Sequence, residues 1–359
     1  MSKIQEIWTD RVEYSKQRFV EKDKDELEPG QILVEIDKFA LTANNVSYAL
    51  SGEAIGYWGY FPTHEGTWGN VPVWGMATVS EVNGSSIKVG ERLYGFFPMS
   101  SHLIMSPGKI SEKHFMDETE HRRPLPPLYN QYMRTEAEPA FMQKLENERC
   151  LYFPLFITGY VIADFLMDQS WMQAEQIIIS SISSKTGYSC ANFIKSMGFE
   201  GNLVGITSPR NHEFVTQLGT ADQVISYGEE DRLNKVSSVY VDMSGDGNTR
   251  REIHSHFADL LKSSQVVGAT HWESERTGKG LDGPKPEFFF APSQIAKRNQ
   301  EWGPGVLLQK GSGASADLAA KLADQVSIEF HQGAQNVMQI WADLLANKVS
   351  GQKGLIVNL

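Results

Sequence analysis

Residues 174–198 have the pattern of a buried strand, a serine-rich turn and an amphipathic helix that ends at Gly198. The apolar run Ile177–Ile179 is short and β-branched, as in a strand that is covered on both faces. Ala191 and Ile194 then change the apolar spacing toward the helical period. Because a helix N-terminus follows the turn, its backbone N–H groups and its dipole favour a phosphate there. The segment therefore predicts a nucleotide-phosphate site.

The turn itself is poor in glycine. Gly187 is the one glycine kept, and Lys185 stands where a dinucleotide-binding turn normally has glycine. Serine hydroxyls can donate to phosphate oxygens beside the backbone N–H groups, and a lysine adds a point charge. A Walker A loop for phosphoryl transfer is the weaker alternative, because Ser181 or Ile182 occupies the position of its first glycine.

The 359-residue chain contains 41% hydrophobic and 21% charged residues, which is ordinary for a globular protein of two domains. Its net charge of −11 argues against nucleic acid and against an anionic membrane surface as partners. Cys150 and Cys190 are too few for a disulfide scaffold, so a reducing cytoplasm is the expected location. We see neither a signal peptide nor an apolar run of about 20 residues, as a membrane helix needs.

The order of expected elements predicts an α/β fold. The first ~105 residues show strands at Gln31–Phe39, Val71–Val82 and Ile87–Phe97, and residues 106–150 are interpreted as an inserted connector. From Leu151 strands and helices alternate, which predicts a doubly wound parallel sheet. After residue 295 we expect a Gly-rich loop (Gly303–Gly313), two helices and a strand, Gly354–Leu359, that pairs with the first domain. The expected domains are 1–150 with 296–359, and 151–295.

The end of the second strand of this sheet bears on the choice of nucleotide. An NAD-binding fold usually presents a carboxylate there to the ribose hydroxyl. This chain instead has Thr207, Ser208 and Arg210, which offer two hydroxyls and a guanidinium to a 2′-phosphate. We therefore expect NADPH/NADP in preference to NAD. In the alternative interpretation, Arg210 is a solvated residue at the start of the next helix.

Colinear motifs extend over some three hundred residues, from Leu33–Ile36 and Thr42–Tyr48 to Pro154–Tyr160 and Gly354–Leu359. Together they resemble the medium-chain dehydrogenase/reductase superfamily, specifically its zinc-independent quinone-reductase and enoyl-reductase branch. The resemblance implies a Rossmann-type sheet plus a β-rich GroES-like N-terminal domain that the C-terminal segment completes. Ser181, Ser184 and Lys185 depart from the glycines of the family's phosphate turn, as in a side branch. The motifs that carry the resemblance are Leu33–Ile36, Thr42–Tyr48, Val71–Val79, Val89–Gly95, Pro154–Tyr160, Leu218–Tyr227 and Gly354–Leu359.

The resemblance also implies a set of cofactor-binding residues. Thr158 is expected at the nicotinamide end, and Phe289 in a segment that closes over it or forms a dimer contact. The pyrophosphate is expected at Ser181, Ser183, Ser184, Lys185, Thr186 and Gly187. The adenosine 2′-phosphate is expected at Thr207, Ser208, Arg210 and Tyr227. Five residues at the carboxyl ends of later strands are expected to face the cofactor, namely Asp242, Ser244, Gly268, Ala269 and Thr270.

The expected chemistry uses no metal. His64-Glu65-Gly66 imitates the family's zinc-ligand signature, but it lies about ten residues before the segment that aligns with it, and no cysteine is near. Without a metal, hydrogen-bond donors must stabilise an enolate-like oxygen or protonate the adjacent carbon. Tyr48, three residues after the pair Asn44 and Asn45, is the first candidate donor and Tyr60 the second. The alternative is that these aromatic residues only form an apolar wall.

Together these observations predict NADPH-dependent, zinc-independent reduction of a polarised C=C bond in a flat or apolar enone, quinone or enoyl thioester. Carbonyl reduction on the same fold is the alternative within enzymes. A non-catalytic NADPH-binding sensor or structural protein is the alternative outside them. The resemblance further implies a homodimer that continues the cofactor-domain sheet, with Glu287–Ala291 as its edge.

Overall fold

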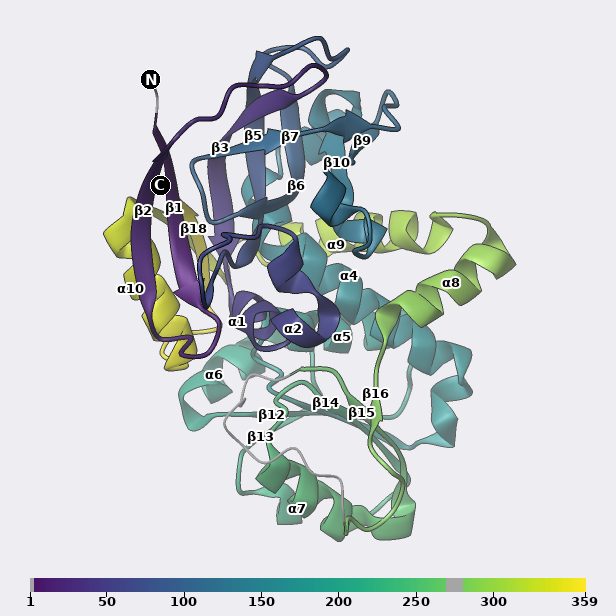
Figure 1. Cartoon of the computed structure of the whole chain (residues 1–359). Coiled ribbons are helices and arrows are strands. Elements are labelled where there is room, and N and C mark those ends of the chain that lie inside the picture. The colour runs from purple at the N-terminus through teal and green to yellow at the C-terminus, as the bar shows by residue number, and fades with distance from the viewer. Residues whose placement is uncertain (1–2, 269–279) are drawn as a thin grey trace. The chain divides into compact units, whose positions relative to one another are not determined.

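The computed structural model describes residues 3–268 and 280–359 and divides into two compact units (Figure 1). Unit 1 comprises Met1–Leu151, Ile328–Val349 and Lys353–Leu359, and unit 2 comprises Tyr152–Ser327 and Ser350–Gln352. Residues 296–327 belong to unit 2, whereas the sequence analysis placed them in the first domain. Ala269 and Thr270, which were expected to face a cofactor, lie outside the described residues.

Two antiparallel sheets form unit 1. Within the described part of the chain, the larger sheet has nine strands in the order β17-β18-β3-β5-β6-β10-β9-β8, with β7 paired to β3. The smaller one has the order β2-β1-β4. The strands are β1 (Lys3–Asp10), β2 (Gln17–Asp23), β3 (Ile32–Leu41), β4 (Trp68–Gly69), β5 (Pro72–Val82), β6 (Arg92–Pro98), β7 (His102–Met105), β8 (Pro107–Gly108), β9 (His114–Asp117), β10 (Gln131–Arg134), β17 (Ser327–Gln332) and β18 (Lys353–Asn358). The last strand pairs with the first long one, since Leu355 lies opposite Leu41.

Residues 106–150 do not form a separate insertion, because they extend the large sheet through β8, β9 and β10. A buried arginine holds this proline-rich segment together. Arg122 is 1% exposed, and its guanidinium donates to Asp117 at 2.7 Å, to Asn130 at 3.0 Å and to the Tyr132 hydroxyl at 2.9 Å. A buried charge is tolerated only with such partners. The segment is therefore an integral part of unit 1.

The helices of unit 1 are α1 (Ala43–Leu50), α2 (Gly52–Ile55), α3 (Ala140–Gln143) and α10 (Ala334–Leu345). Helix α4 (Glu146–Asp168) begins in unit 1 and continues in unit 2. Among the described helices, α4 alone is long and apolar enough to cross a membrane by length and composition. Its most apolar window is 67% buried, which is what a core helix of a folded domain shows.

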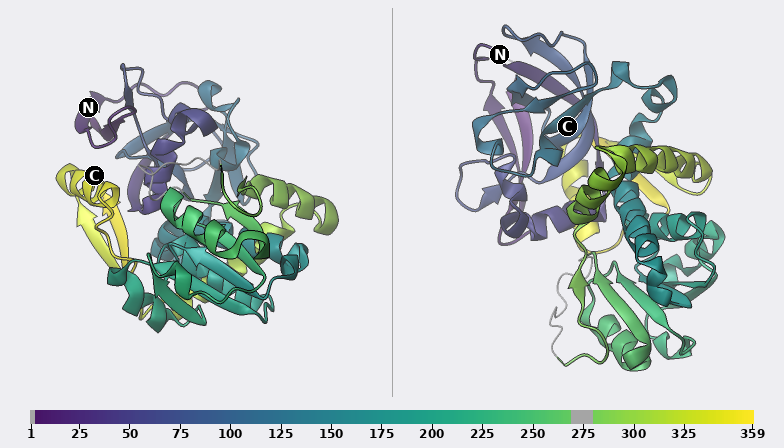
Figure 2. Two further views of the ribbon diagram at one scale, coloured as in Figure 1. Left: turned by 90° about the horizontal axis from the view of Figure 1, so that it is seen from below. Right: turned by 90° about the vertical axis from the view of Figure 1, so that its right-hand side faces the viewer.

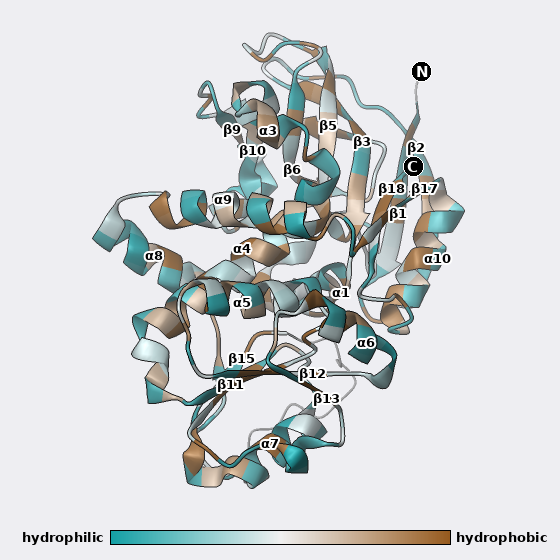
Figure 3. Cartoon of the chain, turned by 180° about the vertical axis from the view of Figure 1, so that it is seen from behind, coloured by the Kyte–Doolittle hydropathy of each residue, from teal (hydrophilic) through white to brown (hydrophobic). Residues whose placement is uncertain are grey.

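Six parallel strands form the sheet of unit 2, in the order β13-β12-β11-β14-β15-β16. This is the doubly wound order expected from the sequence. Helices α5 and α6 cover one face and α7 the other, and the strands twist as parallel sheets do (Figures 1 and 2). The elements are β11 (Gln176–Ser180), α5 (Lys185–Ser196), β12 (Asn202–Thr207), α6 (Pro209–Leu218), β13 (Gln223–Ser226), β14 (Ser238–Asp242), α7 (Gly247–Phe257), β15 (Leu261–Val266) and β16 (Glu287–Phe288). The strands β11 and β12 are strongly hydrophobic (Figure 3), which agrees with burial on both faces.

The expected Gly-rich loop at Gly303–Gly313 is wrong over most of its length. Helix α8 (Ala291–Trp302) is followed after three residues by helix α9 (Val306–Lys321). Gly311 lies inside α9 because it packs tightly against α4. A Cβ atom at that position would lie 3.0 Å from Ile157 Cδ1 and 3.2 Å from Tyr160 Cδ1. Close helix packing therefore explains a glycine that the sequence suggested was a loop residue.

Candidate nucleotide and substrate site

The carboxyl ends of β11 and β14 mark the point where the strand order of unit 2 reverses. The two strands are adjacent and in register, with Ser180 opposite Asp242. The chain leaves β11 toward β12 and leaves β14 toward β15, in opposite directions along the sheet. Ligands of open α/β sheets bind in the crevice at such a point. The turn 181–184, which connects β11 to α5, lies there.

The geometry of this turn explains its serines. Ser184 is the N-cap of α5, and its side-chain oxygen accepts a hydrogen bond from Gly187 N at 3.1 Å. Serine is among the best residues at an N-cap, so this exchange of glycine for serine stabilises the helix. Ser181 has a φ of +49°, a conformation that favours glycine. Its N–H donates to the Tyr227 hydroxyl at 2.9 Å, which holds the strained residue in place.

Gly187 remains a glycine because helix α5 passes very close to the turn. A Cβ atom there would lie 2.7 Å from the carbonyl oxygen of Ser181 and 2.8 Å from Cα of Ile182. In dinucleotide-binding folds the last glycine of the turn serves this same close packing of helix on strand. The turn therefore keeps the one glycine that its packing requires.

Two further residues of the turn region were expected at the pyrophosphate. Lys185 is the first residue of α5, and burial lowers the pKa of its ammonium group to about 8. Ser183 is 8% exposed, and its hydroxyl oxygen accepts a hydrogen bond from Asn211 Nδ2 at 3.1 Å. Thr186 follows Lys185 in the first helical turn, where backbone N–H groups lack partners within the helix. The local structure thus resembles an anion cradle.

The end of β12 and the start of α6 contain polar atoms that no described residue satisfies. Thr207 Oγ1 and Ser208 Oγ are buried and have no hydrogen-bond partner among the described residues, and the same holds for Asn211 Oδ1. Arg210 is exposed in the first turn of α6. Buried polar atoms without partners are uncommon, and each calls for a ligand, an ion or ordered water. The two hydroxyls can donate to a nucleotide phosphate, whereas Asn211 Oδ1 is an acceptor and does not bind one.

Other expected cofactor residues are engaged within the protein. Both carboxylate oxygens of Asp242 have partners, with Oδ1 accepting from Ser180, Ser244 and Gly245 at 2.9–3.0 Å. Its Oδ2 accepts two hydrogen bonds from Arg250, at 3.0 and 2.6 Å. Asp242 and Ser244 therefore build the buried floor of the crevice, and a cofactor role for either stays a prediction.

Three more of the expected residues have clear packing roles. Gly268 lies so close to β14 that a Cβ atom would be 2.0 Å from the carbonyl oxygen of Met243. The Thr158 hydroxyl donates to the Pro154 carbonyl at 2.9 Å, one turn earlier in α4. Phe289 is 8% exposed and packs edge-on against Phe165, with ring centroids 5.5 Å apart. Contact of these residues with a cofactor stays a prediction.

Unit 1 supplies a compact aromatic cluster, defined here as Tyr48, Tyr57, Tyr60, Phe61 and Phe96 with the partly buried Trp74, Leu103, Leu125 and Tyr129. Its hydroxyl groups are paired in a specific way. Tyr57 and Tyr129 share a hydrogen bond of 2.9 Å, and Tyr60 donates to the Pro126 carbonyl at 2.8 Å. The Tyr60 proton is thus already committed to the backbone.

Tyr48 differs from the other tyrosines of the cluster because its oxygen accepts a hydrogen bond from an indole. The donor is Trp74 Nε1, at 3.1 Å. A phenol has one proton to donate, and no described residue accepts it from Tyr48. Burial raises the pKa of Tyr48 well above its usual range, so the hydroxyl remains protonated. Tyr48 is therefore a neutral hydroxyl with an uncommitted proton.

Asn45, the second residue of the expected asparagine pair, has a structural role. Its side-chain oxygen accepts from Thr42 N at 2.8 Å in a capping box, and its Nδ2 donates to the Pro72 carbonyl at 2.9 Å. It fixes the start of α1 against β5 and so positions Asn44 and Tyr48. A direct catalytic role for Asn45 stays a prediction, since its polar atoms are already paired.

Sequence reasoning missed Trp74 and Tyr129. Trp74 lies in β5, where alternation marks it only as a strand residue, and Tyr129 lies in the segment interpreted as a connector. Among the described residues, no three His, Cys, Asp or Glu side chains gather as a metal site would require.

Comparisons with known proteins place the chain in a family. The chain belongs to the family described as "Protein of unknown function (DUF2855)", which matches residues 39–350. A comparison with curated proteins found no match. The fold is shared with solved reductase structures, which confirms the fold that the resemblance to the medium-chain dehydrogenase/reductase superfamily implied.

Three solved structures illustrate this likeness. CurA from Vibrio vulnificus, in complex with NADPH, has a TM-score of 0.62 at 13% identity, over 99% of this chain and 98% of that one. A quinone oxidoreductase from Pseudomonas syringae pv. Tomato has a TM-score of 0.60 at 16% identity, over 98% and 99% of the two chains. A mutant enoyl thioester reductase from Candida tropicalis has a TM-score of 0.57 at 12% identity, over 100% of each chain.

Proposed function

We propose that this protein is an NADPH-dependent, zinc-independent oxidoreductase that reduces a polarised C=C bond in an enone, quinone or enoyl thioester. The observation that carries the reaction type is the Tyr48 hydroxyl, which is neutral, accepts a hydrogen bond from Trp74 and has no acceptor for its proton among the described residues. Solved reductases of the same fold support the proposal, because one is described as a quinone oxidoreductase and another as an enoyl thioester reductase.

The residues of unit 2 fit NADPH. Ser183, Ser184, Lys185 and Thr186 would hold the pyrophosphate, and Thr207, Ser208 and Arg210 would hold the 2′-phosphate. The unsatisfied hydroxyls after β12 support this choice, as does NADPH in the CurA structure. When bound, NADPH supplies the hydride for the reduction.

Tyr48 would act on the substrate carbonyl oxygen. Its hydroxyl donates a hydrogen bond to that oxygen, where negative charge develops during reduction, and a donor aimed at developing charge lowers the barrier. Trp74 holds the phenol oxygen through its indole N–H, which limits the directions that the O–H bond can take. The apolar rings of the aromatic cluster exclude water around the reacting atoms.

The test measures binding and turnover separately. Purified protein is mixed with NADPH, whose fluorescence is expected to increase and shift to the blue on binding. Enones, quinones, enoyl thioesters, and aldehydes or ketones are then added, and the loss of NADPH absorbance is followed. Oxidation by a C=C substrate, reduced about 10²-fold or more in Tyr48→Phe with NADPH affinity unchanged, supports the proposal.

Other outcomes of this test contradict the proposal in distinct ways. Turnover of simple aldehydes or ketones alone favours carbonyl reduction. NADPH binding without oxidation of any substrate favours a sensor or structural protein, and failure to bind NADPH removes the cofactor assignment itself. A Tyr57→Phe variant is the matched control for loss of a hydroxyl in the same cluster, because Tyr57 pairs with Tyr129 instead of Trp74.

A further inference from the structure

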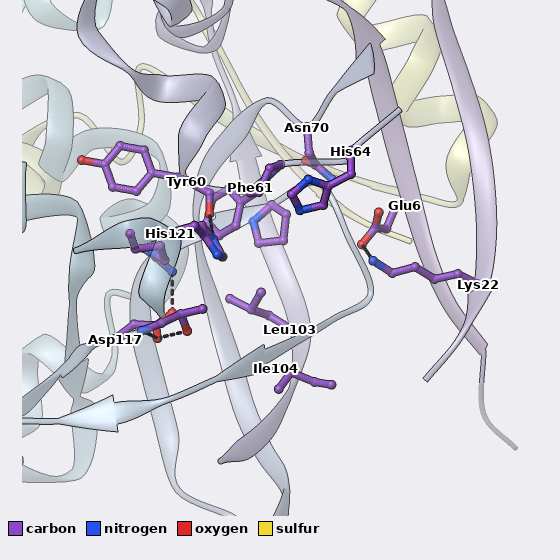
Figure 4. A pocket seen from close by; sticks show the side chains of 14 residues that line it. Glu6, Lys22, Tyr60, Phe61, His64, Asn70, Leu103, Ile104, Asp117 and His121 are labelled. Atoms are coloured by element: carbon purple, nitrogen blue, oxygen red, sulfur yellow. Dashed lines mark hydrogen bonds and ion pairs between the residues drawn. The ribbon is translucent and has the colours of Figure 1, made fainter. Parts of the chain in front are cut away.

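A pocket in unit 1 is not used by the proposed reaction. It has a volume of about 150 Å³ and is lined by residues from β1, β2, β6, β7 and β9 and from the segments 60–70 and 119–122. Figure 4 shows Asn70 and His64 close together, the ion pair of Glu6 and Lys22 to one side, and Leu103 with Ile104 below. Every lining residue lies in unit 1.

The wall of this pocket is held in place by specific contacts. Arg18 is stacked between Trp8 and Trp68, with its guanidinium carbon 4.6 and 4.5 Å from the ring centroids. The Thr63 hydroxyl donates to the Trp68 carbonyl at 2.7 Å. His64, next to Thr63, has a φ of +58°, a conformation that a non-glycine residue keeps only when its surroundings enforce it. The segment that bounds the pocket is therefore a fixed part of the fold.

Asn70 points to what the pocket binds. The residue is 2% exposed, and its Oδ1 accepts a hydrogen bond from Met99 N at 2.7 Å, which fixes the orientation of the amide. No described residue accepts a hydrogen bond from Nδ2. This Nδ2 belongs to the small exposed part of the residue, since it is not among the buried side-chain atoms that lack a partner. Asn70 thus brings an unused donor to the lining of the pocket.

The acidic groups of the pocket are already neutralised by the protein. Glu6 accepts from Trp8 Nε1 at 2.5 Å and from Lys22 Nζ at 2.9 Å. Asp117 accepts from Arg122 at 2.7 Å and from Thr119 N at 3.1 Å. The groups that remain available are donors. Asn70 offers an N–H, and the Lys22 ammonium has three protons, of which its ion pair with Glu6 uses one. The pocket is therefore built for an acceptor.

We propose that this pocket binds a short-chain organic acid through its carboxylate, with Asn70 Nδ2 and Lys22 Nζ as donors. A cavity of this volume accommodates a molecule of about the size of benzene. Phe61, Leu103 and Ile104 supply an apolar surface for the alkyl part. The proposal does not depend on the proposed reductase activity. The pocket shares Tyr60, Phe61 and Leu103 with the aromatic cluster, so a bound acid would contact the back of that cluster.

The test uses isobutyrate as the probe and isobutyramide as its uncharged analogue. Saturation-transfer difference NMR on the full-length protein is expected to show isobutyrate binding that is at least tenfold tighter than isobutyramide binding. Asn70→Asp keeps the acceptor for Met99 N and replaces the donor by a negative charge. It is expected to weaken isobutyrate binding at least tenfold, whereas Asn234→Asp, on an exposed residue of unit 2, leaves it unchanged.

Three outcomes would overturn the proposal. Equal binding of the acid and the amide means that the charge is not recognised. Unchanged isobutyrate affinity in Asn70→Asp, with an unchanged far-ultraviolet circular dichroism spectrum, means that Asn70 is not a ligand. If saturating NADPH displaces isobutyrate, the acid binds at the nucleotide site and not in this pocket. Binding of isobutyrate that persists with NADPH is the expected result and supports a separate pocket.

Discussion

Trp74 donates its indole N–H to the hydroxyl oxygen of Tyr48 across 3.1 Å, from a strand to the first helix of the chain. This bond turns a buried tyrosine into an oriented donor. Trp74→Phe keeps the ring in the cluster but removes the N–H. Under the proposed function we expect kcat to fall about tenfold, as for loss of one positioning hydrogen bond, with little change in KM.

The matched control for Trp74→Phe is Tyr129→Phe, which breaks the hydroxyl pair with Tyr57 and leaves the bond of Trp74 to Tyr48 in place. Steady-state kinetics with the best substrate from the panel compares the two variants. An equal loss of kcat in both would show that Trp74 acts only through packing of the cluster.

Lys185 predicts a pH dependence of NADPH binding. Burial lowers the pKa of its ammonium to about 8, so the charge that attracts phosphate is present below pH 8 and lost as the pH rises above it. The Kd of NADPH is expected to increase from pH 7 to pH 9, as measured by fluorescence titration. Lys185→Ala should weaken binding at pH 7 by ~1.5–3 kcal/mol, the contribution of a charge-assisted bond.

Lys195→Ala is the control for this experiment. Lys195 lies in the last turn of the same helix and pairs with Asp222, so it should leave both the affinity and its pH dependence unchanged. If the Kd of NADPH depends on pH in Lys185→Ala as it does in the wild type, Lys185 is not the origin of the pH dependence.

Glu230 predicts loss of stability with rising pH. Burial, together with the neighbouring carboxyl of Glu252, raises the pKa of Glu230 to about 7. The folded protein therefore holds a proton that the unfolded chain releases near pH 4.5, so this contribution to stability is lost as the pH rises from about 4.5 through 7. Glu230→Gln should raise the unfolding free energy at pH 8 by about 1–2 kcal/mol, less than the full shift implies because Glu252 is exposed to water.

Thermal unfolding of Glu230→Gln at pH 5 and pH 8 checks this sign. The increase in Tm over the wild type should be large at pH 8 and small at pH 5, because the wild-type carboxyl of Glu230 is protonated at pH 5. Glu252→Gln should give a similar but weaker pattern, because it removes the charge that repels Glu230. A gain in Tm of the same size at both pH values would contradict the assignment.

Gly187 and Gly313 make a matched pair of helical glycines. Gly187→Ala places a Cβ atom 2.7 Å from the Ser181 carbonyl oxygen, so we expect a loss of about 1–3 kcal/mol and weaker NADPH binding. Gly313 lies on the exposed side of α9 with nothing within 4 Å of such an atom. Gly313→Ala should stabilise the protein by about 0.5–1 kcal/mol. Urea unfolding of both variants tests this contrast, and a destabilised Gly313→Ala would count against it.

The edge of the parallel sheet predicts a homodimer. Phe288 and Phe290 flank the buried Phe289 and are 64% and 54% exposed at β16, the last strand in the sheet order. We expect Phe288→Glu to convert a dimer to a monomer in size-exclusion chromatography with light scattering. Phe330→Glu, at an equally exposed phenylalanine of unit 1, should have no effect. A wild-type protein that is already monomeric would exclude this dimer.

Short buried strands were the most predictable part of this molecule. The runs in β11 and β14 are too short and too apolar to be anything else, and their order along the chain defines the parallel sheet. Segments whose structure depends on distant partners were not predictable. Position 311 is a glycine inside a helix because α4 leaves no room for a side chain, and residues 106–150 fold around Arg122, whose burial no local pattern shows.

In the candidate site, too, the local features were predictable and the features that depend on distant residues were not. Ser184 and Gly187 were identifiable, since capping and close packing follow the order of strand, turn and helix. The available proton of Tyr48 was not, because it depends on Trp74, which is 26 residues away in another element. The position of Asp242 at a strand end was predictable from the local sequence, but its ion pair with Arg250 was not.

The pairing of β18 with β3 sets an order of events during synthesis. Leu355 lies opposite Leu41, so one side of β3 stays without this strand until Lys353–Asn358 have left the ribosome. Residues 152–327 of unit 2, by contrast, are made as one continuous stretch in between. Domains generally fold as units once their residues have emerged. Unit 2 is therefore expected to be folded before unit 1 completes its large sheet.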